Sequence, residues 1–540
     1  MKEDLLPKTV SVFREGYDFA RLKADALSGL TVAIVALPLS MAIAIASGVT
    51  PDRGLYTAII GGFIVSALGG SRHQIGGPAG AFIVLVAATV TRHGIDGLLL
   101  ATAMAGLLLV IAGLLRLGDY IKFIPYPVTI GFTAGIAVII FASQIGELLG
   151  LSFTGPEPGP LIEKLPAIFA ALPTISPSAA GIAALTVTSI LLIRRFRPTW
   201  PGLLIAVIVA SAAAALLALP VSTIGSKFGG IPSGLPWPSL PRVSFDLAIA
   251  VLPDAIAFAL LGAIESLLSA VVADGMTGRR HRSNMELVAQ GLANIGSALF
   301  GGICVTGTIA RTATNVRAGG TSPVSGMLHS AFLLTFMVVA APLAAYIPLA
   351  ALAGVLAVVS WNMVERSAIL ALVRASRGES LVLGVTFVLV VFRDLTEGIL
   401  VGVSLAALQF IHHMSKGLRV TSQRDEAPLD NTDADTVIYR LDGAFFFGAV
   451  ATASAVLDRI ADGHRNLILD CTGIQLIDTS GANLLAGVIR KAQRSGVTVY
   501  VVSDRPEIRL MLSHHDLASG DLIFTATLGQ AQWAARGDTI

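Results

Sequence analysis

The sequence predicts an α-helical polytopic membrane protein with 14 transmembrane segments, arranged as two inverted seven-span repeats and followed by a small α/β domain. Three observations support this prediction: an apolar composition, a series of charge-free windows, and two interrupted apolar segments at corresponding places in the two halves. Of the 540 residues, 54% are hydrophobic and 13% are charged, and the mean hydropathy is +0.78. These values exclude an ordinary soluble protein. The formal net charge of +2 gives no indication of a nucleic-acid partner.

Seven windows in the first half are long enough to cross about 30 Å of hydrocarbon. They cover residues 26–47, 54–70, 74–91, 97–115, 123–146, 165–193 and 198–226. The third window is unusual because Gly76 and Gly77 interrupt its start and Pro78 follows them. Proline is favoured in the first turn of a helix. We therefore expect a helix to begin near Ala79.

The second half contains an equivalent series after a Pro- and Gly-rich stretch at 225–241. Its windows cover residues 255–273, 287–310, 318–364, 381–392 and 398–411. The window 318–364 is long enough for two helices, and the last two windows predict a tight helical pair. With the half-helix that begins near Ile309, this series also has seven members. The predicted membrane domain is residues 26–420, with repeats at about 26–226 and 247–415, after an N-terminal segment of residues 1–25.

The basic loop residues support this topology. If the chain starts inside, six of them fall outside: Arg53, Arg92, Lys164, Lys227, Arg242 and Arg393. The remaining loop arginines and lysines fall inside, as the positive-inside rule requires. The charged N-terminal segment lacks an early apolar run of the signal-peptide type. We expect both termini to be cytoplasmic, and an odd number of spans per half makes the two repeats inverted.

The composition changes after the last window. Residues 421–435 form a polar linker, and residues 436–540 alternate strand and helix patterns, which is typical of a small soluble α/β domain. The expected strands cover residues 437–441, 467–471 and 497–503. The expected helices cover residues 449–461, 480–494, 507–514 and 528–536.

The segment 301–320, GGICVTGTIARTATNVRAGG, interrupts the second half as the segment 69–82, GGSRHQIGGPAGAF, interrupts the first. Residues 303–308 have the composition of an extended segment, and residues 309–316 predict a helix with Arg311 in its first turn. Two broken segments at corresponding places indicate a transporter site at the interface of inverted repeats.

Two helix starts that meet near the membrane midplane would attract an anion. Each start has unpaired N–H groups and a positive dipole end, Arg311 adds a full charge, and Gly76 allows close backbone approach. Thr306 could supply a further hydroxyl. The candidate substrate-binding residues are Gly77, Pro78, Ala79, Gly307, Thr308, Ala310, Arg311 and Thr312. The alternative is that Arg311 snorkels or pairs structurally with Glu265 and binds no substrate.

Four segments carry a family resemblance: PLSMAIAIASG, GAIESLLSAVVADGMTG, GTIARTATNVRAG and LILDCTGIQLIDTSGANLL. Together they resemble the sulfate permease (SulP) family, also called solute carrier family 26, over nearly the whole chain, and among its members the bacterial dicarboxylic-acid uptake type. The resemblance implies a core and a gate domain, a cytoplasmic STAS domain, a homodimer and a bacterial inner-membrane location. It also implies an anion site between the facing ends of spans 3 and 10.

Glu265 is the only carboxylate inside its predicted span, and Ser269 lies one turn further on the same helix face. By resemblance, Glu265 matches a carboxylate implicated in cation coupling, and Ser269 matches a hydroxyl near it. Desolvation disfavours a charged glutamate, which suits Glu265 to carry a proton. Proton coupling is preferred over sodium, and a structural pairing with Arg311 remains open.

In the C-terminal domain, Ser480 stands where related anti-sigma antagonists are phosphorylated, so it is a candidate regulatory site. The preferred reading of Ser480 is a helix N-cap. Cys304 and Cys471 lie in unlike contexts far apart in the sequence, so we expect neither a disulfide nor a metal site. No cofactor and no enzymatic activity are expected.

The predicted function is secondary active transport of sulfate-like oxyanions or C4-dicarboxylates by an elevator-type motion, coupled to protons. Bicarbonate, chloride, fumarate and succinate remain open as substrates. One alternative is a nucleobase transporter of the same fold, although that family carries a carboxylate where this chain has Arg311 and lacks a STAS domain. The other alternative is an uncoupled anion channel.

Overall fold

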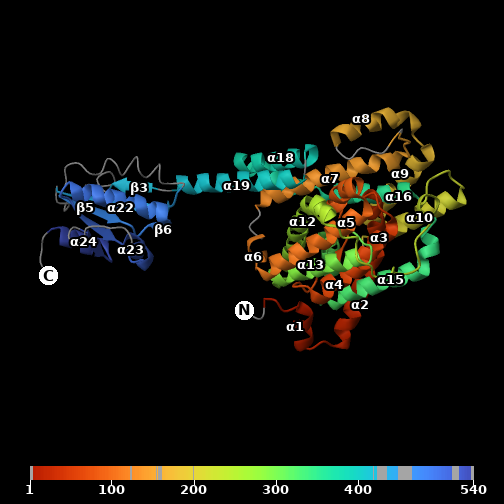
Figure 1. Cartoon of the computed structure of the whole chain (residues 1–540), viewed down its shortest axis with the longest axis horizontal. Coiled ribbons are helices and arrows are strands. Elements are labelled where there is room, and N and C mark those ends of the chain that lie inside the picture. Colours follow the sequence, from red (N-terminus) through yellow and green to blue (C-terminus); the bar gives the residue numbers. More distant parts are fainter. Residues whose placement is uncertain are drawn as a thin grey trace. The chain divides into compact units, whose positions relative to one another are not determined.

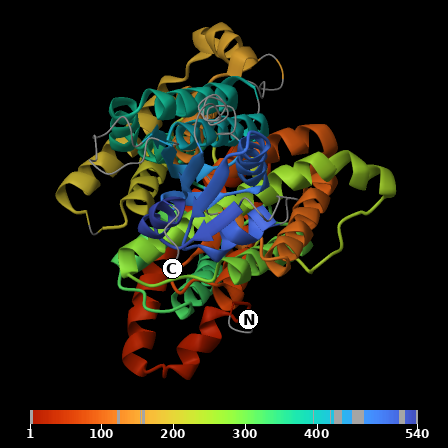
Figure 2. The ribbon, with the colours of Figure 1, turned by 90° about the vertical axis from the view of Figure 1, so that its left-hand side faces the viewer.

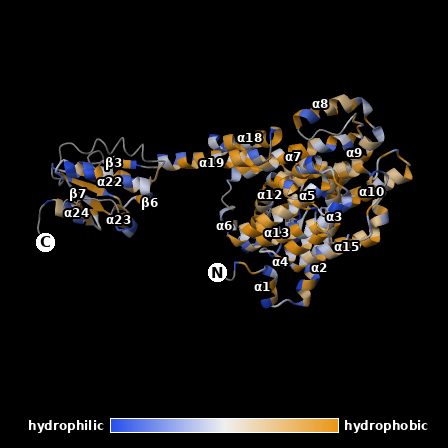
Figure 3. Cartoon of the chain, in the orientation of Figure 1, coloured by the Kyte–Doolittle hydropathy of each residue, from blue (hydrophilic) through white to orange (hydrophobic). Residues whose placement is uncertain are grey.

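The computed structural model describes residues 4–121, 125–153, 155, 161–198, 200–393, 395–417, 419–422, 435–447, 465–513 and 522–536. The chain forms two compact units, Met1–Val403 and Ser404–Ile540. The first is helical, and hydrophobic residues predominate along its helices (Figure 3). Eight helices in the described ranges are long and apolar enough to cross a membrane.

The first half of the helical unit follows the predicted windows with two differences (Figure 1). Its elements are α1 (Lys8–Arg14), α2 (Phe19–Ala46), α3 (Pro51–Tyr56), the π-helix η1 (Thr57–Gly61), α4 (Gly62–Leu68), β1 (Gly76–Gly77), the 3-10 helix η2 (Gly80–Phe82), α5 (Ile83–Leu114), α6 (Gly118–Ile121), α7 (Tyr126–Leu149), α8 (Leu161–Ala171), the 3-10 helix η3 (Leu172–Thr174), α9 (Pro177–Phe196), α10 (Gly202–Leu216) and α11 (Ile224–Phe228).

The differences concern where helices break. The later part of window 74–91, from Ile83, and nearly all of window 97–115 lie in one element, α5, which is interrupted by the non-helical Gly94 at φ 67°. The window 165–193 is not a single helix as predicted. It is split into α8 and α9: Pro173 lies between them in η3, and Pro177 is the first residue of α9, where proline favours a new helix start.

The second half contains the predicted interrupted segment. Its elements are α12 (Phe245–Thr277), α13 (Ser283–Leu299), β2 (Thr306–Gly307), α14 (Ile309–Arg317), α15 (Val324–Ala344), α16 (Leu349–Met363), α17 (Arg366–Ala375), α18 (Arg377–Phe392) and α19 (Leu395–Lys416). The prediction of an extended run followed by a helix from Ile309 is confirmed. The helical pair α18–α19 is also confirmed, and both helices are longer than their charge-free windows.

The core of this unit is built where α5 packs along α12 and α13, and where α2 packs along α15 (Figures 1 and 2). The crossing of α5 and α13 requires glycine on both sides. A Cβ added at Gly106 would lie 2.6 Å from the Gly291 carbonyl oxygen, and one at Gly291 would lie 2.4 Å from the Gly106 oxygen. Small residues allow this backbone contact, which is a common way for membrane helices to associate.

The second unit contains a mixed sheet with strand order β3-β4-β5-β7-β8, in which β6 also pairs with β4. Strand β3 is antiparallel to β4, and the other pairs are parallel. The strands are β3 (Arg419–Ser422), β4 (Thr436–Phe445), β5 (Asn466–Asp470), β6 (Ile474–Ile477), β7 (Thr498–Val502) and β8 (Leu522–Thr525). The helices are α22 (Thr479–Arg494), α23 (Pro506–Ser513) and α24 (Leu528–Ala535).

Each face of this sheet has its own apolar cluster. Leu469 and Val501 pack with α22 and α23 on one face, whereas Ile468 and Tyr500 pack with Ala531 of α24 on the other. The alternation of neighbouring residues is what a strand covered on both faces produces. Three strands were not predicted, and β3 begins before the expected linker 421–435. The predicted helix 449–461 lies outside the described residues.

Candidate functional site

The two interrupted segments meet in the structure as a pair of short antiparallel strands. Gly76 of β1 lies opposite Gly307 of β2, and Gly77 lies opposite Thr306. The Thr308 N–H also donates to the Ile75 carbonyl at 3.1 Å. This β1–β2 crossing therefore brings together segments from the two halves of the chain.

The extended backbone before β2 is satisfied by side chains, which is required because hydrocarbon offers no hydrogen-bond partner. Ile303 N–H donates to Thr57 Oγ1 at 2.7 Å, and the Ile303 carbonyl accepts from Ser297 Oγ at 2.6 Å. Asn294 makes both bonds to Val305, accepting from its N–H at 3.0 Å and donating to its carbonyl at 2.8 Å. These contacts explain how the chain can unwind inside an apolar unit.

A helix follows each strand, and neither helix is capped by a side chain. Thr308 is the N-cap of α14 and Ala79 is the N-cap of η2, and neither makes a side-chain capping bond. The first-turn N–H groups of both helices thus lack a protein cap. The expectation that Pro78 lies in the first helical turn is wrong. Pro78 is still in the extended segment, and its carbonyl accepts a 3.4 Å bond from Arg311 Nη2.

Arg311 lies in the first turn of α14 with a side chain only 2% exposed. Its Nη2 also donates to Ser40 Oγ at 3.0 Å. The Nε and Nη1 atoms are buried and have no hydrogen-bond partner among the described residues. No ion pair between Arg311 and Glu265 is found in the described part of the chain.

Two of the predicted glycines are required because side chains lie directly against them. A Cβ at Gly77 would lie 1.9 Å from Arg311 Nη1, and a Cβ at Gly307 would lie 1.9 Å from Gln74 Nε2. Any other residue at either place would displace the contacting side chain. Both glycines therefore shape the site without contributing functional groups.

A cavity of about 620 Å³ opens beside the helix starts. The candidate residues that line it are Pro78, Ala79, Glu265, Thr308, Ala310 and Arg311. Its wall also includes the charged residues Arg194, Arg317 and Glu365. Gly77, Gly307, Thr312 and Ser269 are not among its lining residues.

The two proposed coupling residues have different surroundings. Glu265 of α12 lines the cavity, is 8% exposed and has no hydrogen-bond or ion-pair partner among the described residues. Ser269 is fully buried and donates to Thr312 Oγ1 at 3.1 Å. Thr312 Oγ1 in turn accepts from Ile75 N–H at 3.2 Å. Ser269 and Thr312 therefore join α12, α14 and the approach to β1 rather than face the cavity.

Ser480 belongs to the other unit, in the first turn of α22. The expectation that it is the helix N-cap is wrong, because Asp478 occupies that position and accepts from Gly481 N–H at 2.8 Å. Within the described ranges, no group of three or more His, Cys, Asp and Glu residues is placed to hold a metal ion.

Three functional neighbours were missed or undervalued in the sequence. Ser40 contacts Arg311, but a serine within an apolar helix carries no distinguishing pattern. Gln74 lies against Gly307, and its position before the Gly pair was a usable signal. Glu286 is 0% exposed in the first turn of α13. It was excluded because the predicted window began after it, at residue 287.

Comparisons with known proteins agree with this geometry. Residues 22–386 match the model of the sulfate permease family, and residues 427–530 match the STAS domain. The chain is 40% identical to the Bacillus subtilis protein named "Putative sulfate transporter YvdB", over 90% of this chain and 92% of that protein.

Two solved structures share the fold. The transmembrane domain of the cyanobacterial bicarbonate transporter BicA is 32% identical, with a TM-score of 0.62 over 72% of this chain and 98% of that one. The murine anion transporter Slc26a9, in the inward-facing state, is 19% identical, with a TM-score of 0.87 over 99% of this chain and 94% of that one. The chain therefore belongs to the sulfate permease family of anion transporters and carries a C-terminal STAS domain.

Proposed function

We propose that this protein is a secondary active transporter of small oxyanions, and that its substrate binds at the β1–β2 crossing. The observation that supports this most directly is Arg311, a buried guanidinium at the wall of a 620 Å³ cavity. Two of its nitrogens have no hydrogen-bond partner among the residues that the structure describes. Leaving buried donors unpaired is costly. A bound anion would satisfy them and would also receive the uncapped N–H groups of η2 and α14.

Sulfate and bicarbonate are the substrates proposed first, because similar proteins are named as sulfate and bicarbonate transporters. C4-dicarboxylates remain in the proposal because a second carboxylate could reach Arg194 or Arg317 in the same cavity. The nucleobase alternative is disfavoured, since Arg311 stands where that family has a carboxylate. The uncoupled channel is the second candidate that the uptake measurement must address.

We assign coupling to a proton carried by Glu265. Its carboxylate lines the cavity and has no partner in the described ranges, so protonation breaks no hydrogen bond there. A hard cation such as sodium needs several oxygen ligands, and the hydroxyl proposed to help, Ser269, is engaged with Thr312. A carboxylate alone suits a proton better than a metal cation.

The transport cycle we propose is an elevator-type motion of the core that carries β1, β2 and α14, within a 14-span domain of two inverted repeats. Residues 26–420 would form this domain, with residues 436–540 as a cytoplasmic STAS domain. The protein would act as a homodimer in a bacterial inner membrane, with both termini cytoplasmic. Ser480, partly exposed in the first turn of α22, is retained as a candidate phosphorylation site, since a phosphate is favoured at a helix N-terminus.

The test is an uptake panel in proteoliposomes with sulfate, bicarbonate, succinate, fumarate, chloride and, as a counter-substrate, uracil. We expect saturable sulfate or bicarbonate accumulation driven by an inward proton gradient and not by a sodium gradient. Arg311→Ala should abolish it. Uptake of uracil alone, or an anion flux that no gradient can drive uphill, would replace this proposal with one of the alternatives.

A further inference from the structure

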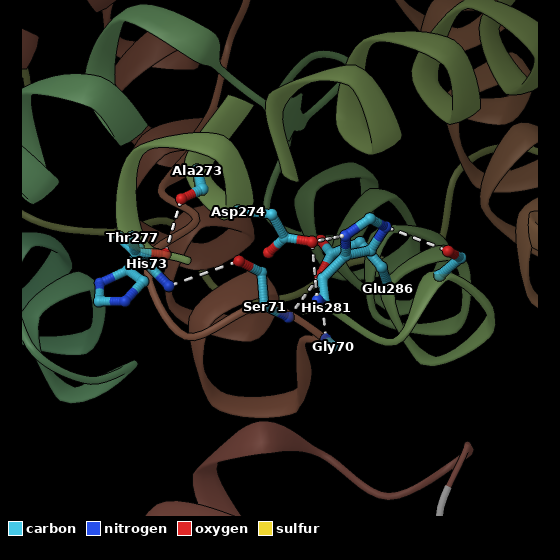
Figure 4. Close-up of polar contacts among 9 residues, drawn as sticks. Gly70, Ser71, His73, Ala273, Asp274, Thr277, His281 and Glu286 are labelled. Atoms are coloured by element: carbon cyan, nitrogen blue, oxygen red, sulfur yellow. Dashed lines mark hydrogen bonds and ion pairs between the residues drawn. The ribbon is translucent and has the colours of Figure 1, made fainter. Parts of the chain in front are cut away.

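A second buried glutamate, Glu286, lies at the start of α13 and accepts hydrogen bonds from several segments (Figure 4). Its Oε2 accepts from the N–H groups of Gly70 at 2.9 Å and Ser71 at 3.1 Å. Its Oε1 accepts from Gln74 Nε2 at 2.8 Å and Gln290 Nε2 at 2.9 Å. No ion pair to Glu286 is found among the described residues. The side chain is fully buried and has no role in the proposed transport cycle.

The chemistry of these contacts suits a fixed carboxylate. A fifth, longer contact comes from Ser266 Oγ, which donates to Oε1 at 3.4 Å. All five partners are donors, so both carboxylate oxygens are held as hydrogen-bond acceptors. A protonated carboxyl would turn an O–H toward one of them and lose an acceptor. Glu265 has the opposite surroundings, since it faces the cavity with no partner among the described residues.

Glu286 is connected to the anion site through Gln74. Gln74 Nε2 also donates to Ser266 Oγ at 2.9 Å, next to Glu265 on α12. The same Nε2 lies where a Cβ at Gly307 would be, so Gln74 packs directly against β2. Glu286 therefore holds both the turn that leads into β1 and the side chain on which β2 rests.

The geometry points to Glu286 as a positioning residue for substrate binding: through Gly70, Ser71 and Gln74 it sets the β1–β2 crossing, and with it the start of α14 that carries Arg311. This inference rests on the proposed function, because it assigns Glu286 a role at that site. Glu286 touches no substrate in it and takes no part in proton transfer.

The primary variant is Glu286→Gln, which keeps the shape of the side chain. It replaces one acceptor oxygen with an NH₂ group, which would face N–H donors in either orientation of the amide. The matched control is Glu147→Gln, the same change at an exposed ion pair with Lys227. We expect Glu286→Gln to raise the KM for sulfate uptake by roughly tenfold, with a smaller change in maximal rate. Gln74→Ala, which leaves the carboxylate in place, should raise KM in the same direction.

The pH profile separates positioning from proton transfer. The KM increase in Glu286→Gln should be the same factor at every pH between 5.5 and 8, roughly spanning the titration range of histidine. Two histidines on neighbouring segments must be considered, of which His281 interacts electrostatically with Glu286 and His73 points away from it (Figure 4). His281 precedes α13 and is held by Asp274 through a 2.7 Å contact at Nδ1, and His73 lies between Ser71 and Gln74 with a buried ring. His281→Gln and His73→Gln in the Glu286→Gln background should leave the factor unchanged.

A measurement without substrate makes the inference independent of transport. Hydrogen–deuterium exchange of residues 69–77 and 303–308 should be faster in Glu286→Gln than in wild type, with Glu147→Gln unchanged. If the wild type took up no sulfate, the proposed function would fail while the exchange result would still decide this inference. The inference would be overturned if Glu286→Gln kept the wild-type exchange rates and an unchanged KM. It would also be overturned if Glu286→Gln lost the pH dependence of uptake, which is the result predicted for Glu265→Gln.

Discussion

At the scale of single residues, position decides what a charge can do. Arg311 and Arg317 lie six residues apart on α14 and both line the cavity. Arg311 is 2% exposed, and its Nε and Nη1 have no partner in the part of the chain that the structure describes, whereas Arg317 is exposed at the end of the helix. Water screens Arg317, and a low effective dielectric strengthens every interaction that Arg311 makes.

We therefore predict that Arg311→Ala weakens sulfate binding far more than Arg317→Ala. Loss of a charge-assisted contact to a desolvated anion should cost about 1.5–3 kcal/mol, a roughly 10- to 100-fold fall in affinity. Loss of the exposed arginine should cost about 1 kcal/mol or less. Isothermal titration of both variants measures the difference. Equal losses, or no loss at Arg311, would move the anion site away from the β1–β2 crossing.

Glu265→Gln should uncouple accumulation from the proton gradient. The amide cannot take up or release the coupling proton, while Arg311 and the helix starts that hold the anion are unchanged. We expect sulfate–sulfate exchange to persist in proteoliposomes and pH-driven uphill uptake to fall to background. Gradient-driven uptake at the wild-type rate in this variant would show that the coupling group lies elsewhere.

The residues of this site differ in how far the sequence could predict them. Arg311 was identifiable because an arginine in a glycine-rich apolar segment has few structural explanations. The family resemblance implied a coupling role for Ser269, and Thr312 was predicted to supply a hydroxyl to the substrate. The structure instead shows them bonded to each other, because two hydroxyls on facing helices satisfy one another. Glu286 was not identified as a site residue, because the windows contain no charged residue and this one begins after it, at residue 287.

At the scale of elements, the interrupted segments were predictable and their details were not. The run of glycine and hydroxylated residues before Ile309 predicted both the extended segment and the start of α14. The other helix start was predicted too early, near Ala79, because Pro78 was placed in the first helical turn. Gly76 and Gly77 are held in strand pairing with β2, so the chain stays extended through Pro78 and turns helical at Gly80. That pairing joins distant segments and leaves no local signal.

The contact between Gln74 and Gly307 predicts that a substitution at Gln74 partly restores sulfate binding to a variant at Gly307. Gly307→Ala should abolish sulfate uptake, because its Cβ would lie 1.9 Å from Gln74 Nε2. Gln74→Ala removes that atom, so the double variant should recover part of the affinity lost in Gly307→Ala. Binding of sulfate to the two single variants and the double variant gives the coupling as a double-mutant cycle. Additive losses would mean that Gln74 does not hold β2.

At the scale of the whole molecule, the helical unit and the sheet unit were both predictable, because their compositions differ sharply. Within the sheet unit, β4, β5 and β7 were identified from apolar runs. Strand β3 was not predicted, and its last two residues fell in the expected linker 421–435. The strand is short, and its place depends on antiparallel pairing with β4. Strand β8 was missed for the same reason, since LIFT pairs only with β7, far from it in the sequence.

The last prediction concerns how far the two units depend on each other. Every residue that lines the 620 Å³ cavity lies between Val32 and Glu365, and the sheet unit has apolar clusters of its own. Truncation after Lys416 should therefore leave sulfate affinity within about twofold of the full chain, as expected for sites without shared partners, although it can change the transport rate or dimer contacts. Arg311→Ala in the truncated protein serves as the weak-binding control. Titration of the monodisperse truncated protein measures this directly: a well-folded membrane unit that binds no sulfate, beside a full chain that does, would require the STAS domain to be part of the anion site.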